Sequence, residues 1–309
     1  MKNRFLLSFI IMGIGASAQQ LPAFSQYFLN DLVLNPAVAG TKEYVPVSLT
    51  HRTQWADFKD APTSQLLSVH GSVNNKMGVG LLLTNHETGP TQLVSAQFAY
   101  SYQLKINDST KLSFGVSPMI MQYTLEKDKI VLDEKNDNTF NRISGKTLVA
   151  DINAGIYLYG RNYSLGFAAP QLLENKLRLG DDLFTERLQR HYLAYASYDY
   201  RLNSTYTLTP SVLFKTVKSA SPPSQLDATM KVMYQQFLWA GLSYRWDMSK
   251  KMNNAAVVFL GVSKFNFVVG YAYDYNFAPL SQYSNGSHEI FLSYRISCKK
   301  KEQTAPKIL

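Results

Sequence analysis

The sequence lacks the features that hold many exported or membrane proteins together. It has a single cysteine, Cys298, in 309 residues, so an exported form must be stable without an internal disulfide. After the first residues its apolar runs are short. Even a long one, from Ala255 to Val262, breaks within about 10 residues, against the 18 or more that a transmembrane helix needs. These two absences exclude a helical membrane protein and favour a large sheet.

The sequence also has few groups that could build a catalytic or metal centre. Its five histidines include no pair at metal-ligand spacing, and no cysteine cluster accompanies them. It has neither a G-x-S-x-G nucleophile elbow nor a glycine-rich phosphate loop before a helix. Ser287, His288 and Glu289 supply the residue types of a hydrolase triad, but adjacent strand residues point to opposite faces. We therefore expect no enzyme activity, no metal and no cofactor.

Charged residues are also scarce, at 17% of the chain, and the net charge is +9. Loss of Lys2 and Arg4 with a leader would lower the net charge to +7, of which four positive charges lie in the C-terminal tail. The other basic residues are scattered and do not alternate with stacking aromatics. This distribution favours anionic lipid or acidic partners over nucleic acid.

Residues 1–18 are predicted to be a secretory signal peptide. Lys2 and Arg4 precede an apolar run from Phe5 to Ile14, which ends at the small residues Ala16-Ser17-Ala18. That run is about half the roughly 20 residues that span a bilayer. We expect cleavage before Gln19 and export of the mature chain.

From about Tyr44 onward, bulky apolar residues alternate with small or polar ones, the pattern of strands with two different faces. The clearest segment is 265–277, where Phe and Tyr recur at every second position. Such segments are about 10 to 13 residues long, whereas strands of soluble domains peak near five or six and a tilted membrane strand needs roughly 9 to 11. The sequence therefore predicts an all-β fold, a transmembrane antiparallel β-barrel of the outer-membrane type over residues 44–298.

The pattern gives about fourteen strands, joined by connections that alternate between short and long. The predicted strands are 44–51, 65–73, 76–86, 93–106, 111–125, 147–160, 163–170, 190–202, 206–218, 225–234, 237–247, 254–263, 266–277 and 287–298. Tight turns are expected in the periplasm and longer loops outside, and an even strand number places both termini in the periplasm. The one weak helical pattern lies near residues 172–190.

Charged residues on the inward strand faces are predicted to form a lumenal ion-pair network rather than general acids and bases. They are Asp199, Arg201, Arg245, Asp274 and Arg295.

Residues 19–43, before the barrel, are apolar but not strand-like. Pro36 stops regular structure, and Gly40 permits a turn into the first strand. Because an apolar segment must be covered, two alternatives stay open: a plug packed in the lumen, or a periplasmic docking element. For docking, the candidates are Phe24 and Tyr27 of this segment with Lys299, Lys300 and Lys301 of the basic periplasmic tail 299–309.

Short motifs spread over the mature chain are similar to those of one known family. They are Phe24-Ser25-Gln26-Tyr27, residues 34–40 (LNPAVAG), 52–55 (RTQW) with 61–63 (APT), 113–116 (SFGV), 241–245 (GLSYR), 270–274 (GYAYD) and 286–290 (GSHEI). In this order they resemble the PorP/SprF proteins of the type IX secretion system, which serves protein export and gliding motility. The chain departs from the family at Val38, where an aromatic is frequent, and in the Lys299-rich extension past the last strand.

The resemblance implies an integral outer-membrane protein without catalytic residues. Such a protein would help to export and hold large adhesins or other cargo with a type IX C-terminal signal, in association with periplasmic and lipoprotein components. Loops 52–64, 126–146 and 278–286 would then contact cargo, with Trp55, Phe58, Tyr283 and His288 as candidate contacts, although the aromatics could instead form an interfacial girdle. The rival interpretations are a porin or transporter for a hydrophobic or small polar solute and a membrane-embedded hydrolase.

Overall fold

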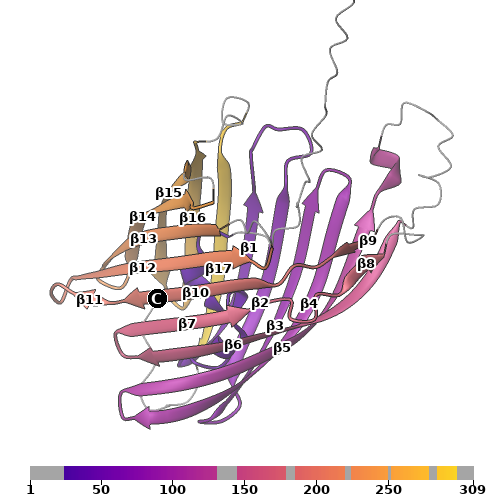
Figure 1. Ribbon diagram of the computed structural model, residues 1–309. Helices are drawn as coiled ribbons and strands as arrows, with labels where there is room; N and C mark the ends of the chain where they lie inside the picture. Colours follow the sequence, from indigo (N-terminus) through magenta and orange to yellow (C-terminus); the bar gives the residue numbers. More distant parts are fainter. Residues whose placement is uncertain are drawn as a thin grey trace, which may run out of the picture.

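The protein is a closed antiparallel β-barrel (Figure 1). The computed structural model describes residues 24–130, 145–178, 185–219, 224–249, 252–277 and 284–297. The predicted signal peptide, Cys298, Tyr283 and the tail lysines lie outside these ranges. In the described part, the barrel strands are β1 Tyr44–Thr53, β2 Thr63–Ser72, β3 Met77–Thr88, β4 Thr91–Asn107, β5 Thr110–Leu125, β6 Lys146–Gly160, β7 Tyr163–Ala169, β10 His191–Tyr198, β11 Tyr200–Arg201, β12 Tyr206–Val217, β13 Ser224–Tyr234, β14 Leu238–Asp247, β15 Met252–Lys264, β16 Phe267–Asn276 and β17 Ser287–Ser297.

The ring closes because every strand pairs with two neighbours. β10 and β11 are one strand interrupted at Asp199, which gives the fourteen strands that the sequence predicts. β1 pairs with β17 from Tyr44 opposite Ser297 to Thr53 opposite His288, and β12 pairs with both β10 and β13. Closure provides partners for the main-chain N–H and C=O groups of the strands, as a bilayer requires.

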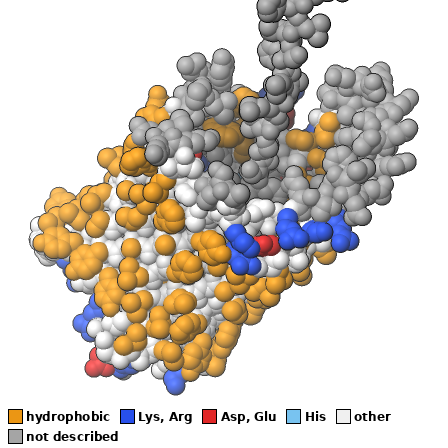
Figure 2. All heavy atoms as spheres, in the orientation of Figure 1, with side chains coloured by type: hydrophobic (Ala, Val, Ile, Leu, Met, Phe, Trp, Pro, Cys, Tyr) orange, Lys and Arg blue, Asp and Glu red, His pale blue; other side chains and the backbone are white. Residues whose placement is uncertain are grey.

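The two faces of the strands differ as predicted. On β16, Phe267, Val269 and Tyr271 are exposed on the outside, whereas Val268, Ala272 and Asp274 are buried inside. The same division holds on β4, where Phe98 and Tyr100 point outward and Ser101 is buried. Figure 2 shows hydrophobic side chains spread over the outer surface of the strands, with charged side chains toward its edges. An apolar exterior of this kind fits a lipid environment.

The two rims of the barrel differ in their connections. β1 begins and β17 ends at the rim that carries the tight turns, such as Arg161-Asn162 between β6 and β7. By the rule for bacterial barrels this rim faces the periplasm, and the rim with longer loops faces outward. One predicted long loop, 87–92, is wrong: β3 and β4 continue the pairing to Thr88 opposite Thr91, which leaves only Gly89 and Pro90 as the turn.

The connection between β7 and β10 contains a small hairpin rather than the weakly predicted helix. Its strands are β8 Lys176–Arg178 and β9 Thr185–Arg187. Leu177 and Leu188 are buried against Met119, Met121 and Val149, which face inward, so part of this connection packs against the inner face of the barrel wall. Within the described ranges, no helix has the length and apolar character needed to cross a membrane.

Candidate functional site

Residues 24–43, here called the lumenal segment, lie inside the barrel before β1 (Figure 1). They form three short 3-10 helices: η1 Tyr27–Leu29, η2 Asp31–Val33 and η3 Pro36–Val38. Asn35 caps η3, since its side-chain oxygen accepts a hydrogen bond from Ala37 N at 2.9 Å, and Pro36 suits the first helical position. Pro36, which is expected from the sequence to stop regular structure, therefore begins a short 3-10 helix.

Apolar side chains of the lumenal segment pack against inward-facing residues on two sides of the barrel. On one side Phe28 makes an edge-on contact with Trp239, with ring centroids 5.9 Å apart, and a tilted contact with Phe259 at 4.7 Å. On the other side Phe24 and Leu32 are buried with Leu66, Leu82 and Ala99. This packing removes the apolar surface of the segment from water.

The backbone of the lumenal segment is hydrogen-bonded to the barrel wall. Ser113 Oγ donates to Ala37 O at 2.6 Å, and Ser101 Oγ donates to Ala39 O at 2.6 Å. Asn35 Nδ2 donates to the carbonyl oxygens of Ile156 and Phe167 at 2.9 and 3.2 Å. Buried backbone groups of an irregular segment need such partners, so the wall and the segment are matched to each other.

Inward-facing glycines let the segment approach the wall this closely. A Cβ added at Gly115 would lie 2.1 Å from Ala37 N, and one at Gly155 would lie 2.1 Å from Asn35 Oδ1. At Gly78 the corresponding distance to Ala39 O is also 2.1 Å. A side chain at any of these positions would displace the lumenal segment.

A cluster of buried charges joins the start of the lumenal segment to five strands. We call Arg52, Asp227, Arg245, Asp274 and Glu289 the charge cluster. Arg52 Nη2 lies 2.8 Å from Asp274 Oδ2, and Arg52 Nη1 lies 3.3 Å from Glu289 Oε2. Arg245 contacts Asp274 at 3.2 Å and Asp227 at 3.4 Å.

The charge cluster also binds the lumenal segment directly. Glu289 accepts hydrogen bonds from the backbone N–H groups of Ser25 and Gln26 at 2.7 and 2.8 Å. Ser25 Oγ donates to the Asp274 carboxylate at 2.7 and 2.8 Å. Charge-assisted bonds of this kind are about twice as strong as neutral ones, so they fix the path of the chain at the start of the lumenal segment.

A second ion pair lies within the lumenal segment itself. Lys42 Nζ is 2.9 Å from Asp31 Oδ2, and both side chains are buried. Burial lowers the pKa of Lys42, but the attraction and hydrogen bond of the Asp31 carboxylate, together with smaller contributions from Tyr44 and Asp199, outweigh it, so the pKa is raised overall. Burial, with a smaller contribution from Asp227, raises the pKa of Tyr27 to about 12, so Tyr27 is a neutral hydrogen-bonding group.

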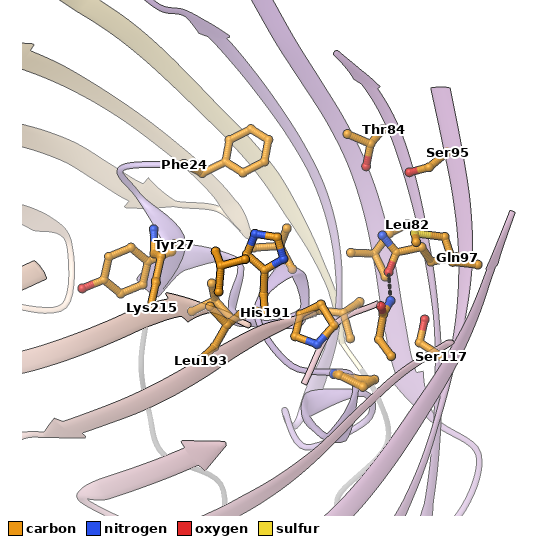
Figure 3. Close-up of a pocket in the computed structure, with 18 of the residues that line it drawn as sticks. Phe24, Tyr27, Leu82, Thr84, Ser95, Gln97, Ser117, His191, Leu193 and Lys215 are labelled. Carbon is orange, nitrogen blue, oxygen red and sulfur yellow. Dashed lines mark hydrogen bonds between the residues drawn. The ribbon is translucent and has the colours of Figure 1, made fainter. Parts of the chain in front are cut away.

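A cavity of about 180 Å³ lies inside the barrel beside the lumenal segment (Figure 3). Phe24, Tyr27 and Leu32 of the segment form part of its apolar lining. His191 and Lys215 line it from the paired strands β10 and β12.

Two outer loops lie side by side at the long-loop rim. Ala56 N donates to Gly286 O at 2.8 Å, Asn285 N donates to Ala56 O at 3.0 Å, and the side chains of Asn285 and Asp57 are hydrogen-bonded. Trp55 and Asp57 have positive φ angles of 54° and 67°, a conformation that is costly for residues other than glycine. The structure thus brings together parts of two of the three loops predicted to contact cargo.

The predicted contact residues are separated by the structure. Trp55 is half-buried in the joined loops, and Phe58 is exposed nearby. His288 lies on the outer face of β17, where its Nδ1 and the Tyr271 hydroxyl are 2.6 Å apart. Phe24 and Tyr27, the docking candidates of the N-terminal region, are buried in the lumen, so their side chains are not available to a periplasmic partner in this conformation. Tyr283, Lys299, Lys300 and Lys301 lie outside the described residues.

Ser287, His288 and Glu289 do not converge. Ser287 and Glu289 are fully buried toward the lumen, whereas His288 points outward. In the part of the chain that the structure describes, no group of three His, Cys, Asp or Glu side chains could hold a metal ion.

The predicted ion-pair network is correct in Arg245 and Asp274 but incomplete. Asp199 is half-buried and accepts a hydrogen bond from Thr209 Oγ1 at 2.7 Å, Arg201 is exposed to solvent at the end of β11 by the turn rim, and Arg295 lies over the Tyr44 ring at 5.1 Å. Arg52 was predicted to be in a loop, but β1 continues to Thr53 and turns this arginine inward. The missed acids are Asp227 and Glu289, and the period-2 pattern could have identified both as inward-facing.

Comparison with solved structures identifies barrels of similar fold. The chain is similar to the "CymD monoaromatic hydrocarbon channel", with a TM-score of 0.51, 11% identity, and coverage of 91% of this chain and 94% of that one. It is also similar to the toluene transporter TbuX of Ralstonia pickettii, with a TM-score of 0.50, 10% identity, and coverage of 87% and 93%. These identities support a shared barrel fold and nothing finer. No curated protein matches the chain.

The sequence model of one family covers nearly the whole chain. Residues 16–294 match the family described as "Type IX secretion system membrane protein PorP/SprF". This match agrees with the closed barrel, its apolar exterior and its loop pattern. The chain belongs to the PorP/SprF family of type IX secretion system proteins and is an integral protein of the outer membrane.

Proposed function

We propose that this protein is a non-catalytic scaffold of the type IX secretion system that supports the export and surface attachment of cargo such as large adhesins. The observation that carries the proposal is the lumenal segment, whose helices are buried and hydrogen-bonded to the barrel wall. A lumen occupied in this way is poorly suited to the passage of a polypeptide. We therefore assign contact with cargo to the rims.

The joined outer loops are the proposed cargo-binding surface. Phe58 is 46% exposed there, and Trp55 lies beside it on a backbone held by the loop between β16 and β17. Exposed aromatic side chains on a fixed backbone favour binding because little conformational entropy is lost. Tyr283 and His288 belong to the same proposal as further contacts.

At the opposite rim we assign contact with periplasmic and lipoprotein components to the basic tail, with Lys299, Lys300 and Lys301. Phe24 and Tyr27 have a different proposed role. Since both are buried against the barrel, they hold the lumenal segment in place.

The alternative is a porin or transporter for a hydrophobic or small polar solute. The lumenal cavity favours it, as does the shared fold with barrels named as hydrocarbon channels. In that case the lumenal segment would have to move, because it occupies the path between the rims.

Deletion of the gene, followed by quantitative proteomics of the cell surface and the medium, tests the proposal. The expected result is loss of specific adhesin-type cargo with normal uptake of nutrients, restored by the wild-type gene. Unchanged surface and secreted proteins, together with impaired uptake of a hydrophobic solute, would instead support the transporter.

A further inference from the structure

The lumenal cavity has the size and the mixed lining of a small-molecule site. A buried cavity of about 150 Å³ in another protein is large enough to bind benzene. The present cavity, at about 180 Å³, therefore has room for one substituted aromatic ring. Phe24, Leu82, Met119 and Leu193 supply apolar lining from the lumenal segment and three strands (Figure 3).

Two residues that line the cavity carry buried polar atoms without a protein partner. His191 is 5% exposed, and its Nε2 has no hydrogen-bond partner among the described residues. Ser117 is 1% exposed, and its hydroxyl likewise has no partner in the described ranges. Both residues line the cavity and lie apart in Figure 3, His191 beside Leu193 and Ser117 below Gln97. Unsatisfied buried polar groups are costly, so a ligand that bonds to them would gain affinity.

The hydrogen bonds of His191 determine whether its unpartnered Nε2 donates or accepts a hydrogen bond. Its Nδ1 lies 2.8 Å from the backbone oxygen of Gln189, which can only accept a hydrogen bond. Nδ1 therefore carries the proton, and Nε2 of the neutral ring is an acceptor. The matching group on a ligand is a donor such as a hydroxyl.

Lys215 offers the complementary donor. It lies on β12, which pairs with β10 so that Lys215 is opposite Leu193 and Val217 is opposite His191. Its nearest carboxylate oxygen, Asp227 Oδ2, is 3.6 Å away, and Asp227 is also held by Arg245 and Gln225. The Lys215 ammonium group can therefore donate to a ligand oxygen at the cavity.

Charge balance favours a neutral ligand over an anion. Arg52, Arg245 and Lys215 are three cations, and Asp227, Asp274 and Glu289 are three carboxylates, all within the connected set of ion pairs. An anion would add an uncompensated charge to a buried region, which is expensive. A hydroxyl group has no such cost, and it can donate to His191 and accept from Lys215.

We propose that the lumenal cavity binds a small neutral molecule with an apolar body and one hydroxyl group, of the size and chemistry of a substituted phenol. The apolar body would lie against Phe24, Leu82 and Met119, and the hydroxyl would lie toward His191 and Lys215. This site is independent of the proposed scaffold role, since the cavity and its unpartnered groups need no cargo.

Three probes with the same ring body test the proposal: 4-methylphenol, toluene and 4-methylbenzoate. Binding to the full chain in lipid nanodiscs is measured by ligand-observed NMR, with empty nanodiscs subtracted to remove partition into lipid. We expect saturable binding of 4-methylphenol, tighter than that of either other probe. The absence of saturable binding, or tighter binding of 4-methylbenzoate or toluene, would overturn the proposal.

Substitutions of residues that line the cavity test whether the probe binds there. His191→Phe keeps a ring but removes the acceptor, and it should weaken 4-methylphenol binding by about tenfold, the effect of one ordinary hydrogen bond. Ser117→Leu fills the cavity and should abolish binding of the probe. His51→Phe, on the exposed outer face of β1, is the matched control and should bind as the wild type does. Heat-modifiable migration verifies that each variant is folded, and binding that survives Ser117→Leu would contradict the proposed location.

Discussion

Glu289 on the last strand accepts a hydrogen bond from the backbone N–H of Ser25 at 2.7 Å, across 264 residues of sequence. The start of the lumenal segment and the last strand of the barrel are thus joined inside the barrel. Because Glu289 also pairs with Arg52 on β1, one carboxylate connects the lumenal segment, the first strand and the last strand. Weakening this bond therefore tests whether it holds the lumenal segment in place.

Replacing Glu289 with glutamine should release the start of the lumenal segment. The change removes one of the two carboxylates that Arg52 contacts, so we expect a loss of unfolding free energy smaller than the roughly 3 to 5 kcal/mol that is typical when a buried ion pair is broken completely. Urea unfolding in lipid vesicles measures that loss, and limited proteolysis near residues 24–30 measures the release. Asp108→Asn, at an exposed ion pair in a turn, is the control and should change neither. Wild-type stability in Glu289→Gln would contradict a structural role for this bond.

Gly115→Ala should displace η3 from the wall. The new Cβ would lie 2.1 Å from Ala37 N, a distance that real contacts essentially never show. We expect faster protease cleavage around residues 34–40 and a lower unfolding temperature. Gly145→Ala is a suitable control because the nearest atom to its added Cβ is 3.4 Å away. Equal cleavage rates in the two variants would show that the close packing has no energetic consequence.

The Asp31–Lys42 pair should behave as one unit. Lys42→Met leaves Asp31 buried without its cation, and Asp31→Asn leaves Lys42 without its anion, so each should destabilise the barrel by about 3 kcal/mol or more. The double variant removes both charges and should recover much of that loss. Urea unfolding of all four proteins gives the coupling. Strictly additive losses would indicate that the two side chains do not interact.

Locking the lumenal segment to the wall should leave cargo export intact. Asn30 Nδ2 donates to Ser68 Oγ at 2.8 Å, so these residues are neighbours, and an Asn30→Cys/Ser68→Cys pair in a Cys298→Ser background is the variant in which to form a disulfide, with loss of free thiols as the check that it has formed. If the protein is a scaffold, the amount of surface cargo will be the same with the disulfide oxidised or reduced. A loss of export on oxidation only, absent in each single cysteine variant, would instead mean that the segment moves during function.

Phe58→Ala should reduce cargo at the cell surface without changing barrel stability. Phe58 is 46% exposed at the outer rim, and truncating an aromatic contact of this kind typically weakens binding by 1 kcal/mol or more. Phe265→Ala at the turn rim, where the side chain is 82% exposed, is the matched control and should leave surface cargo unchanged. Immunoblotting of intact cells measures both. Equal cargo levels in the two variants would argue against the joined loops as the binding surface.

The strands were predictable because the barrel imposes one simple rule on the sequence. Lipid outside and a packed lumen inside produce strict alternation, and predicted ends such as 111–125 differ from the structure by about one residue. The β3–β4 turn was missed because the polar residues from Glu87 to Gln92, with Gly89 and Pro90 among them, resemble a loop in sequence, although Thr88 and Thr91 continue the pairing. Only the pairing of the whole strands decides between these alternatives.

The site was less predictable because its contacts join residues far apart in sequence. The inward position of Asp274 followed from alternation, but its link to Ser25 depends on where the lumenal segment crosses the barrel. The glycines at 78, 115 and 155 looked like ordinary strand residues, and only the path of the lumenal segment explains them. The polar lining of the cavity was hidden for the same reason, since His191 and Ser117 lie on different strands.

The seam between β1 and β17 sets an order for assembly. The first strand cannot find its final neighbour until the last one has been delivered, so ring closure must come late, after every hairpin is available. The lumenal segment is tethered to the first strand and packs against inward-facing residues on two sides of the barrel, so we expect it to be inside before the ring closes. An assembly intermediate without the last strand would lack Glu289, and we expect it to remain an unsealed, protease-sensitive form that quality control can distinguish from the finished protein.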